Sequence, residues 1–292
     1  MWLVLKKDNT PFRPKFTYIC EKKELHPDLH SAFFETESSP IRQIFAWKKS
    51  KFFRIKFIFF VCLSIVGFKH YNTMWILGYE TFLFDESFAW KNILKQKKKK
   101  TLLDIGAGNG SITQILRKYV EKIYFIEPSP SFQKILQKKW YTVVENPGKE
   151  KYDVVTIFNV FDICDNPDEL ISIWINSLWE WWLLVISLPF PLCTRSWDNR
   201  KIRKTNHLGQ KKNTSFEAGV SLFYTDFLRK HQLHVTGFTR LPYIVSLPES
   251  QDVSVYDNGL FICQQGTNSF PVLPRFLRSF SSLSQHPREQ NQ

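Results

Sequence analysis

The sequence has few of the features that mark disulfide-rich, zinc-binding or secreted proteins. Its five cysteines are widely spaced, and no two of them have the C-x-x-C spacing of a zinc or redox site. We therefore expect no metal site and no disulfide framework. The apolar start, Met1–Leu5, is too short for a signal peptide. An intracellular protein, cytoplasmic or associated with endomembranes, is the expectation, and the sequence does not fix the compartment.

A long apolar run is also missing. The most apolar stretch is residues 57–68, which lies between Lys56 and Lys69. A membrane-spanning helix needs about 20 such residues. We therefore expect a buried helix here or, at most, weak contact with a membrane interface.

Acidic residues are scarce relative to basic ones, with 27 Asp and Glu against 40 Lys and Arg, for a net charge of +13. Such a charge could attract nucleic acid or an anionic membrane, or it could belong to a solvated surface. The positive charges are scattered rather than striped. Their densest cluster, 95–100, directly precedes a strand-like segment. This favours the solvated surface.

The chain divides into four parts by composition. We expect a flexible N-terminal extension over 1–43, a helical, aromatic-rich N-terminal region over 44–99 that packs on the core, one domain over 100–265, and a disordered tail over 266–292. Within 100–265, short apolar strands alternate with helical stretches. The expected strands are Thr101–Ile105, Lys122–Ile126, Tyr141–Val144, Tyr152–Phe158, Leu183–Leu188, His234–Arg240 and Gly259–Cys263. This alternation predicts an α/β, Rossmann-like fold with helices on both faces of a mostly parallel sheet.

The strongest motif is LLDIGAGNG at 102–110, where an apolar strand runs into a glycine-rich turn. Gly106, Gly108 and Gly110 would let the backbone approach a ligand at the carboxyl end of the strand. A dinucleotide fingerprint would require glycine at position 111, where Ser111 stands. Asp104 would repel a pyrophosphate but suits the ammonium and sulfonium of S-adenosylmethionine. The motif therefore favours that methyl donor as cofactor.

Polar residues follow the next strands as well. Glu127, at the end of the second strand, is placed to accept hydrogen bonds from both ribose hydroxyls. Asn146 follows the third strand, where either adenine contact or a plain turn would explain it. Asn159 and Asp162 follow the fourth strand and are candidate substrate contacts, although turn formation and helix capping are alternatives. The Asn/Asp-Pro-Pro-aromatic motif of nucleobase amino-methyltransferases is absent, so we expect no nucleic-acid partner.

Several segments together resemble one family, the DREV proteins (methyltransferase-like protein 9), which are protein-histidine N-pros-methyltransferases. The resemblance covers roughly residues 70–265 and is carried by LGYETFLFDESF (77–88), LLDIGAGNGSIT (102–113), IYFIEPS (123–129), YDVVTIFNVFDICDNP (152–167), ISLPFPL (186–192), FTRLPYI (238–244) and LFIC (260–263). It implies a seven-stranded methyltransferase fold and methyl transfer from S-adenosylmethionine to the pros nitrogen of histidine in His-x-His sequences of protein substrates.

The resemblance also implies roles for single residues. Glu127 would bind the ribose, Asn159 and Tyr243 would line the junction between cofactor and target imidazole, and Asp162 would orient the target ring. The chain departs from the family pattern at Asn109, where Asp is usual, and in the basic loop after Pro191. A methyltransferase acting on RNA or a small molecule, and a catalytically degenerate cofactor-binding scaffold, are the competing hypotheses.

Overall fold

The computed structural model describes residues 3–5, 20–36, 80–147, 150–164, 166–175, 178–191, 195–198, 201–204, 214–246 and 253–265. The apolar run at 57–68 and the tail from 266 lie outside the described residues, as does most of the region expected to be helical. In the part of the chain that is described, no helix is long and apolar enough to cross a membrane.

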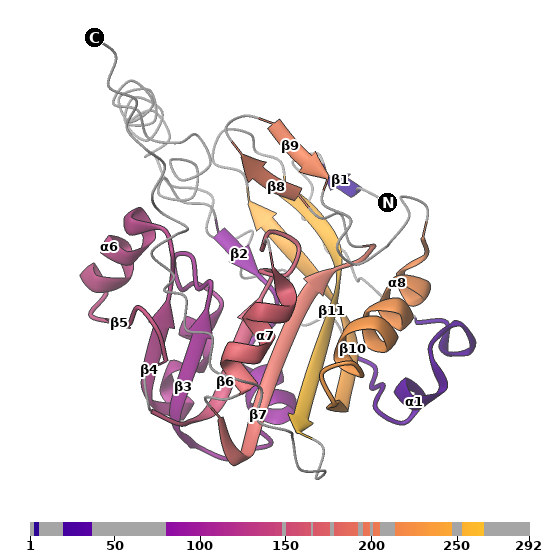
Figure 1. Ribbon diagram of the computed structural model, residues 1–292, viewed down its shortest axis with the longest axis horizontal. Helices are drawn as coiled ribbons and strands as arrows, with labels where there is room; N and C mark the ends of the chain where they lie inside the picture. The colour runs from indigo at the N-terminus through magenta and orange to yellow at the C-terminus, as the bar shows by residue number, and fades with distance from the viewer. Residues whose placement is uncertain are drawn as a thin grey trace, which may run out of the picture.

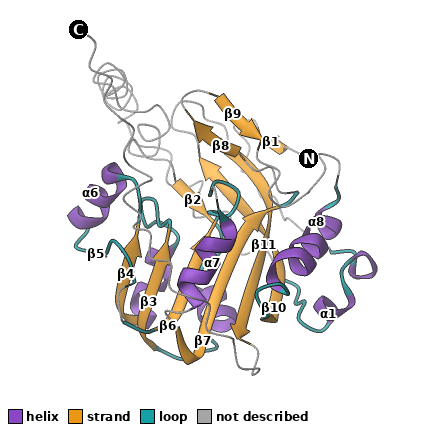
Figure 2. Cartoon of the chain, in the orientation of Figure 1, coloured by secondary structure: helices purple, strands orange, loops and turns teal. Residues whose placement is uncertain are grey.

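A mixed β-sheet forms the centre of the molecule (Figures 1 and 2). Eight of its strands follow the order β2-β10-β11-β7-β6-β3-β4-β5, and β1 pairs with β11. Their bounds are β1 (Leu3–Leu5), β2 (Glu80–Phe82), β3 (Lys99–Ile105), β4 (Val120–Ile126), β5 (Thr142–Val143), β6 (Tyr152–Phe158), β7 (Leu178–Pro189), β10 (Leu233–Ser246) and β11 (Val253–Gln265). A separate pair is formed by β8 (Arg195–Asp198) and β9 (Lys201–Lys204).

Five neighbouring strands, in the order β7-β6-β3-β4-β5, run parallel to one another. Strand β11 runs antiparallel to both of its neighbours, β7 and β10. The five parallel strands therefore end at one edge of the sheet, which is where ligands bind in open α/β sheets. The predicted Rossmann-like α/β class is confirmed. The seven expected strands are present, and β1 and β2 extend the sheet beyond them.

Helices cover both faces of this sheet (Figure 2). One face packs against α5 (Glu86–Phe88), η3 (Ala89–Ile93) and η4 (Thr113–Tyr119) in a core that includes Leu83, Phe84 and Leu102. The other face packs against α7 (Pro167–Ile175), α8 (Phe216–Phe223) and η5 (Tyr224–Leu228). A further helix, α6 (Pro130–Lys138), connects β4 to β5. Strand β6 is buried along nearly its whole length, as expected for a central parallel strand.

Residues 20–36 differ from the flexible extension expected over 1–43, because they pack against the domain. The short helix α1 (Pro27–His30) lies beside α8, and the hydroxyl of Tyr224 donates a hydrogen bond to Asp28 at 2.8 Å. Beyond it, Phe34 N–H donates to the Phe238 carbonyl and Phe238 N–H to the Ala32 carbonyl. Polar composition hid this segment, since the apolar side chains that it buries are too few to show a period.

Strand β2 likewise occupies part of the region expected to be helical. Its backbone pairs with the end of β10, so that Phe82 lies opposite Ile244. Helical residues follow β2, where the Asp85 side chain caps α5 by accepting a hydrogen bond from Phe88 N–H at 2.7 Å. The N-terminal region thus contributes an edge strand as well as a helix.

Leu29→Ala tests whether residues 20–36 belong to the folded domain. Leu29 has no exposed surface, so truncation should lower the free energy of unfolding by about 2–4 kcal/mol. The measurement is urea unfolding at constant pH. The control is Leu222→Ala on α8, where the leucine is exposed and the change should be small. Equal stability of Leu29→Ala and wild type would mean that the segment does not pack in solution.

Candidate functional site

The glycine-rich turn after β3 adopts a backbone that side chains disfavour. Gly106, Gly108 and Gly110 have φ values of +68°, +55° and +74°. A Cβ at Gly106 would collide with Val160 Cγ2, and one at Gly110 would lie 2.9 Å from Leu136 Cδ2. At Gly108 a Cβ would meet nothing within 4 Å. Two of the glycines are thus required by internal packing, while the third faces open space at the carboxyl edge of the sheet.

Asp104 lies at the end of β3 and is almost completely buried. One carboxylate oxygen accepts a hydrogen bond from the hydroxyl of Thr156 on β6 at 2.7 Å, and the other accepts one from the hydroxyl of Thr113 on η4. Burial raises the pKa of this carboxyl to about 7, against the lowering effect of the two hydroxyls. In the structure Asp104 therefore ties the glycine turn to β6 and η4, a role that the predicted ligand contact did not include.

Asp104→Asn should remove a pH dependence of stability. The folded pKa of about 7 exceeds the ordinary value of 3.8, so the folded chain binds more protons between about pH 4 and 7. Stability of the wild type should therefore fall as the pH rises through this window, by up to about 1.4 kcal/mol per pH unit, and level off above it. Urea unfolding at several pH values from 5 to 8 should show that the free energy of unfolding of Asp104→Asn lacks this decline with pH. Parallel curves for both proteins would contradict the assignment.

Glu127 follows β4 directly and is buried beside the glycine turn. One carboxylate oxygen accepts a hydrogen bond from Gly108 N–H at 2.7 Å, and the other accepts one from Ser129 N–H at 2.8 Å. Burial raises the pKa of Glu127, while the two backbone donors oppose the shift. Each carboxylate oxygen can accept more than one hydrogen bond, so capacity for a ligand's hydroxyls remains. The structure thus brings the expected ribose acceptor into contact with the expected glycine.

Asn159 closes the end of β6 next to this turn. Its backbone is left-handed, with φ of +56°, a region that asparagine tolerates better than most residues. Its N–H donates to the Ser187 carbonyl of β7 at 2.8 Å. The side-chain amide is buried, and neither its nitrogen nor its oxygen has a hydrogen-bond partner within the described part of the chain. Because the following residue, Val160, packs on Gly106, this amide lies at the edge that carries the glycine turn.

The other predicted site residues are spread along the same edge. Asp162 is partly buried in the turn after Val160. Tyr243 is half-buried on β10, opposite Tyr256 of β11, and its ring packs against the core that contains Phe158 at the end of β6. Asn146 is exposed after β5. The sequence prediction missed Thr113 and Thr156. Thr156 lies directly opposite Asp104 on the neighbouring strand, so the strand register would have indicated Thr156 if it had been known.

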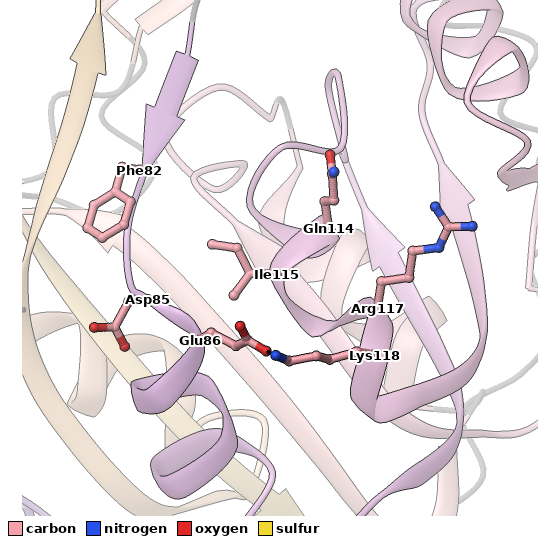
Figure 3. A pocket seen from close by; sticks show the side chains of 7 residues that line it. All are labelled: Phe82, Asp85, Glu86, Gln114, Ile115, Arg117 and Lys118. Carbon is pink, nitrogen blue, oxygen red and sulfur yellow. Dashed lines mark ion pairs between the residues drawn. The ribbon is translucent and has the colours of Figure 1, made fainter. Parts of the chain in front are cut away.

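A separate cleft of about 620 Å³ lies between β2–α5 and η4 (Figure 3). In the figure, Glu86 and Lys118 point toward each other across it, and the two form an ion pair. The hydroxyl of Tyr119 also donates to Glu86, at 2.8 Å. The lining residues are Phe82, Asp85, Glu86, Gln114, Ile115, Arg117 and Lys118. None of the predicted site residues lines this cleft, and its polar contacts hold η4 against the N-terminal region.

Comparison with known families fits this geometry. Residues 19–265 match the family described as DREV methyltransferase. The chain belongs to the DREV methyltransferase family. The match begins at residue 19, so it includes the segment 20–36 that packs on the domain, rather than starting at the domain start expected near 100. The cofactor is accordingly S-adenosylmethionine, as predicted, and the chain is a methyltransferase.

Solved structures of methyltransferases are similar to this DREV chain at low identity. An S-adenosylmethionine-dependent methyltransferase from Clostridium acetobutylicum is 11% identical, with a TM-score of 0.43 over 73% of this chain and 99% of that one. Precorrin-6y C5,15-methyltransferase from Geobacter metallireducens is 13% identical, with a TM-score of 0.41 over 62% and 87%. Coclaurine N-methyltransferase, bound to N-methylheliamine and SAH, is 11% identical, with a TM-score of 0.41 over 62% and 69%. These identities are too low to indicate the substrate of the DREV chain.

The described residues fit the cofactor. Open space at Gly108 admits a ligand against the backbone, the buried Glu127 carboxylate beside it suits the ribose hydroxyls, and the amide of Asn159 lies at the same edge. The Asp104 carboxyl is engaged by two hydroxyls, so in its ionised form it would act on a cationic ligand through space rather than by direct pairing.

Glu127→Ala should weaken the binding of S-adenosylhomocysteine by about 1.5–3 kcal/mol, the usual effect of losing hydrogen bonds to a charged group. Isothermal titration calorimetry measures the change. Glu121→Ala, on the preceding strand β4 and exposed, is the matched control and should bind as the wild type does. Unchanged affinity of Glu127→Ala would remove this residue from the cofactor site.

Proposed function

We propose that this chain transfers a methyl group from S-adenosylmethionine to the pros nitrogen of histidine in His-x-His sequences of target proteins. The observation that carries the proposal is the buried amide of Asn159, which has no partner among the described residues and lies beside the glycine turn. A buried amide without hydrogen bonds is costly, and a bound polar acceptor would relieve that cost. The resemblance to the DREV histidine methyltransferases supports histidine as that acceptor.

An uncharged amide suits a neutral imidazole better than a cationic amine. A free imidazole has a pKa of about 6.5, so most of it is neutral and nucleophilic at pH 7. A lysine acceptor would arrive charged and would need to lose a proton before reaction. Asn159 can hydrogen-bond to the ring or to the peptide beside it without imposing a charge on the reacting nitrogen.

The reaction is a direct displacement at the methyl carbon. S-adenosylmethionine supplies an electrophilic methyl group on a sulfonium, which leaves as a neutral thioether. The pros nitrogen forms the new N–C bond with its lone pair, and the ring becomes cationic until it releases the proton on its other nitrogen. The residues therefore contribute mainly alignment, which can lower a barrier by about 7–11 kcal/mol.

Asp162 is the proposed orienting group. A carboxylate that accepts the N–H of the far ring nitrogen fixes the tautomer and leaves the near nitrogen's lone pair free. The same negative charge would stabilise the cationic ring that forms during transfer. Tyr243, on the neighbouring hairpin, would cover the ring and exclude water from it. The family resemblance and the position of these residues along one edge of the sheet support both roles.

The deciding experiment is mass spectrometry of peptides after incubation with isotopically labelled S-adenosylmethionine. A His-Ala-His peptide should gain one methyl on a ring nitrogen, identified as pros by fragmentation against synthetic standards. His-Ala-Ala should react poorly, and a lysine peptide and an RNA should not react. Methylation of the RNA or lysine peptide instead would reject the histidine proposal. Transfer to none of them, with intact cofactor binding, would favour a catalytically degenerate scaffold.

A further inference from the structure

A second buried amide lies at the same edge of the sheet. Asn258 on β11 has no exposed surface, and neither side-chain atom has a hydrogen-bond partner within the described ranges. It was not among the residues predicted from the sequence. In both Asn159 and Asn258, therefore, the amide nitrogen and oxygen are buried without a partner among the described residues, although 98 residues lie between them in the chain.

The strand register places the two asparagines on either side of the same strand, β7. Asn258 pairs with Pro189 at the end of β7 on one side and with Leu241 of β10 on the other. Asn159 N–H is bonded to the carbonyl of Ser187, two residues before Pro189 on the same strand. The two asparagines thus flank the carboxyl end of β7, one on each side.

The alternation of side chains along β11 decides which face Asn258 occupies. It shares a face with Leu260 and Ile262, which belong to the core against which Tyr243 packs. Tyr243 pairs with Tyr256, two residues from Asn258, and is only half-buried. An acceptor that contacts Tyr243 is therefore one row of side chains, about 7 Å, from Asn258.

The energetics argue against a purely structural role. A central strand position lined by Leu241 and Leu260 is best filled by a β-branched or other apolar side chain. An amide there gives up its hydrogen bonds to water and gains none in return from the described residues. Its presence is accounted for if a molecule that enters the site provides both a donor and an acceptor.

We propose that Asn258 is a second amide of the methyl-acceptor site and hydrogen-bonds an uncharged polar group of the acceptor, the peptide unit next to the reacting side chain. This inference rests on the proposed function for the identity of the acceptor. An asparagine side chain matches a peptide group in both directions, because its nitrogen donates and its oxygen accepts. Asn258 is thus a binding residue that positions the chain carrying the target ring.

The test uses Asn258→Leu, which keeps the approximate volume and removes the polar atoms. The specificity constant kcat/KM for the His-Ala-His peptide should fall by roughly tenfold, mainly through a higher KM, as for one lost hydrogen-bonding group. Affinity for S-adenosylhomocysteine should be unchanged, and Tm should equal or exceed that of wild type. A structural role would instead lower Tm together with activity.

The matched control is Thr239→Val. Thr239 is also buried with an unpartnered hydroxyl in the described structure, but it lies opposite Leu260, one row farther from the carboxyl edge. The kcat/KM of Thr239→Val should stay within about twofold of the wild-type value, because residues outside the acceptor site have small effects.

Retained kcat/KM in Asn258→Leu, or a loss of activity that merely follows a loss of Tm, would overturn the inference. If the wild type methylates a lysine peptide or RNA instead, the proposed function fails, and Asn258→Leu is then judged on that acceptor by the same criteria. Transfer by the wild type to no acceptor would contradict both.

Discussion

Asp162→Asn is expected to lose most of the methyl-transfer activity while keeping the fold and the affinity for S-adenosylhomocysteine. The substitution preserves shape but removes the negative charge that would hold the target ring's N–H and stabilise the cationic product. Loss of such a group typically reduces kcat by about 10²-fold or more. The loss should appear in kcat rather than in cofactor binding, because the interaction strengthens as the ring becomes charged.

Two further variants serve as comparisons for the loss of activity expected in Asp162→Asn. Tyr243→Phe keeps the ring and removes only the hydroxyl, so it should cause a milder loss than Asp162→Asn. Asp226→Asn removes a charge from an exposed position on η5 and should leave activity unchanged. The assay is methyl transfer to the His-Ala-His peptide. Wild-type kcat in Asp162→Asn would exclude Asp162 from the mechanism.

The sheet was largely predictable from the sequence, because its central strands are short apolar runs with polar boundaries. Strand β6 runs over Tyr152–Phe158, as expected, and β3 ends at Ile105 as expected. The edges were less predictable. Strand β10 extends to Ser246, six residues past its expected end at Arg240. The extension, LPYIVS at 241–246, is apolar and largely buried, but Pro242 lies within it and a proline in a run argues against a strand interior. Backbone pairing with β11 and β2 nevertheless continues the strand past this proline.

The glycine turn and the acid beside it could also be predicted from the sequence, whereas Asn258 could not. Glycines that need positive φ and an acid after the next strand are local signals, and the structure brings Gly108 and Glu127 together. Asn258 depends on which strand lies beside β7, and β11 reaches that place only by running antiparallel between β7 and β10. Which strands lie side by side is a property of the whole fold, so it cannot be predicted from any short segment of the sequence.

Gly108→Ala and Gly106→Ala should separate the binding of the cofactor from the stability of the turn. At both positions φ lies in the left-handed region, which costs an alanine about 1–2 kcal/mol relative to glycine. At Gly106 the new methyl group would also displace Val160, which would add about 1–3 kcal/mol and disturb the neighbouring Asn159. At Gly108 the methyl group would meet no protein atom within 4 Å, so the fold should lose only the backbone cost.

Both variants, Gly108→Ala and Gly106→Ala, should nevertheless bind S-adenosylhomocysteine more weakly than the wild type does. In Gly108→Ala the methyl group occupies the space through which the ligand reaches the backbone beside Glu127, so the affinity should drop roughly tenfold or more, in proportion to the contact that is lost. Urea unfolding and calorimetry on the same samples separate the two effects. A Gly108→Ala variant that binds as tightly as the wild type would place the cofactor away from this turn. If Gly106→Ala is no less stable than Gly108→Ala, then Val160 does not hold the turn closed, and the position of Asn159 beside the cofactor loses its main support.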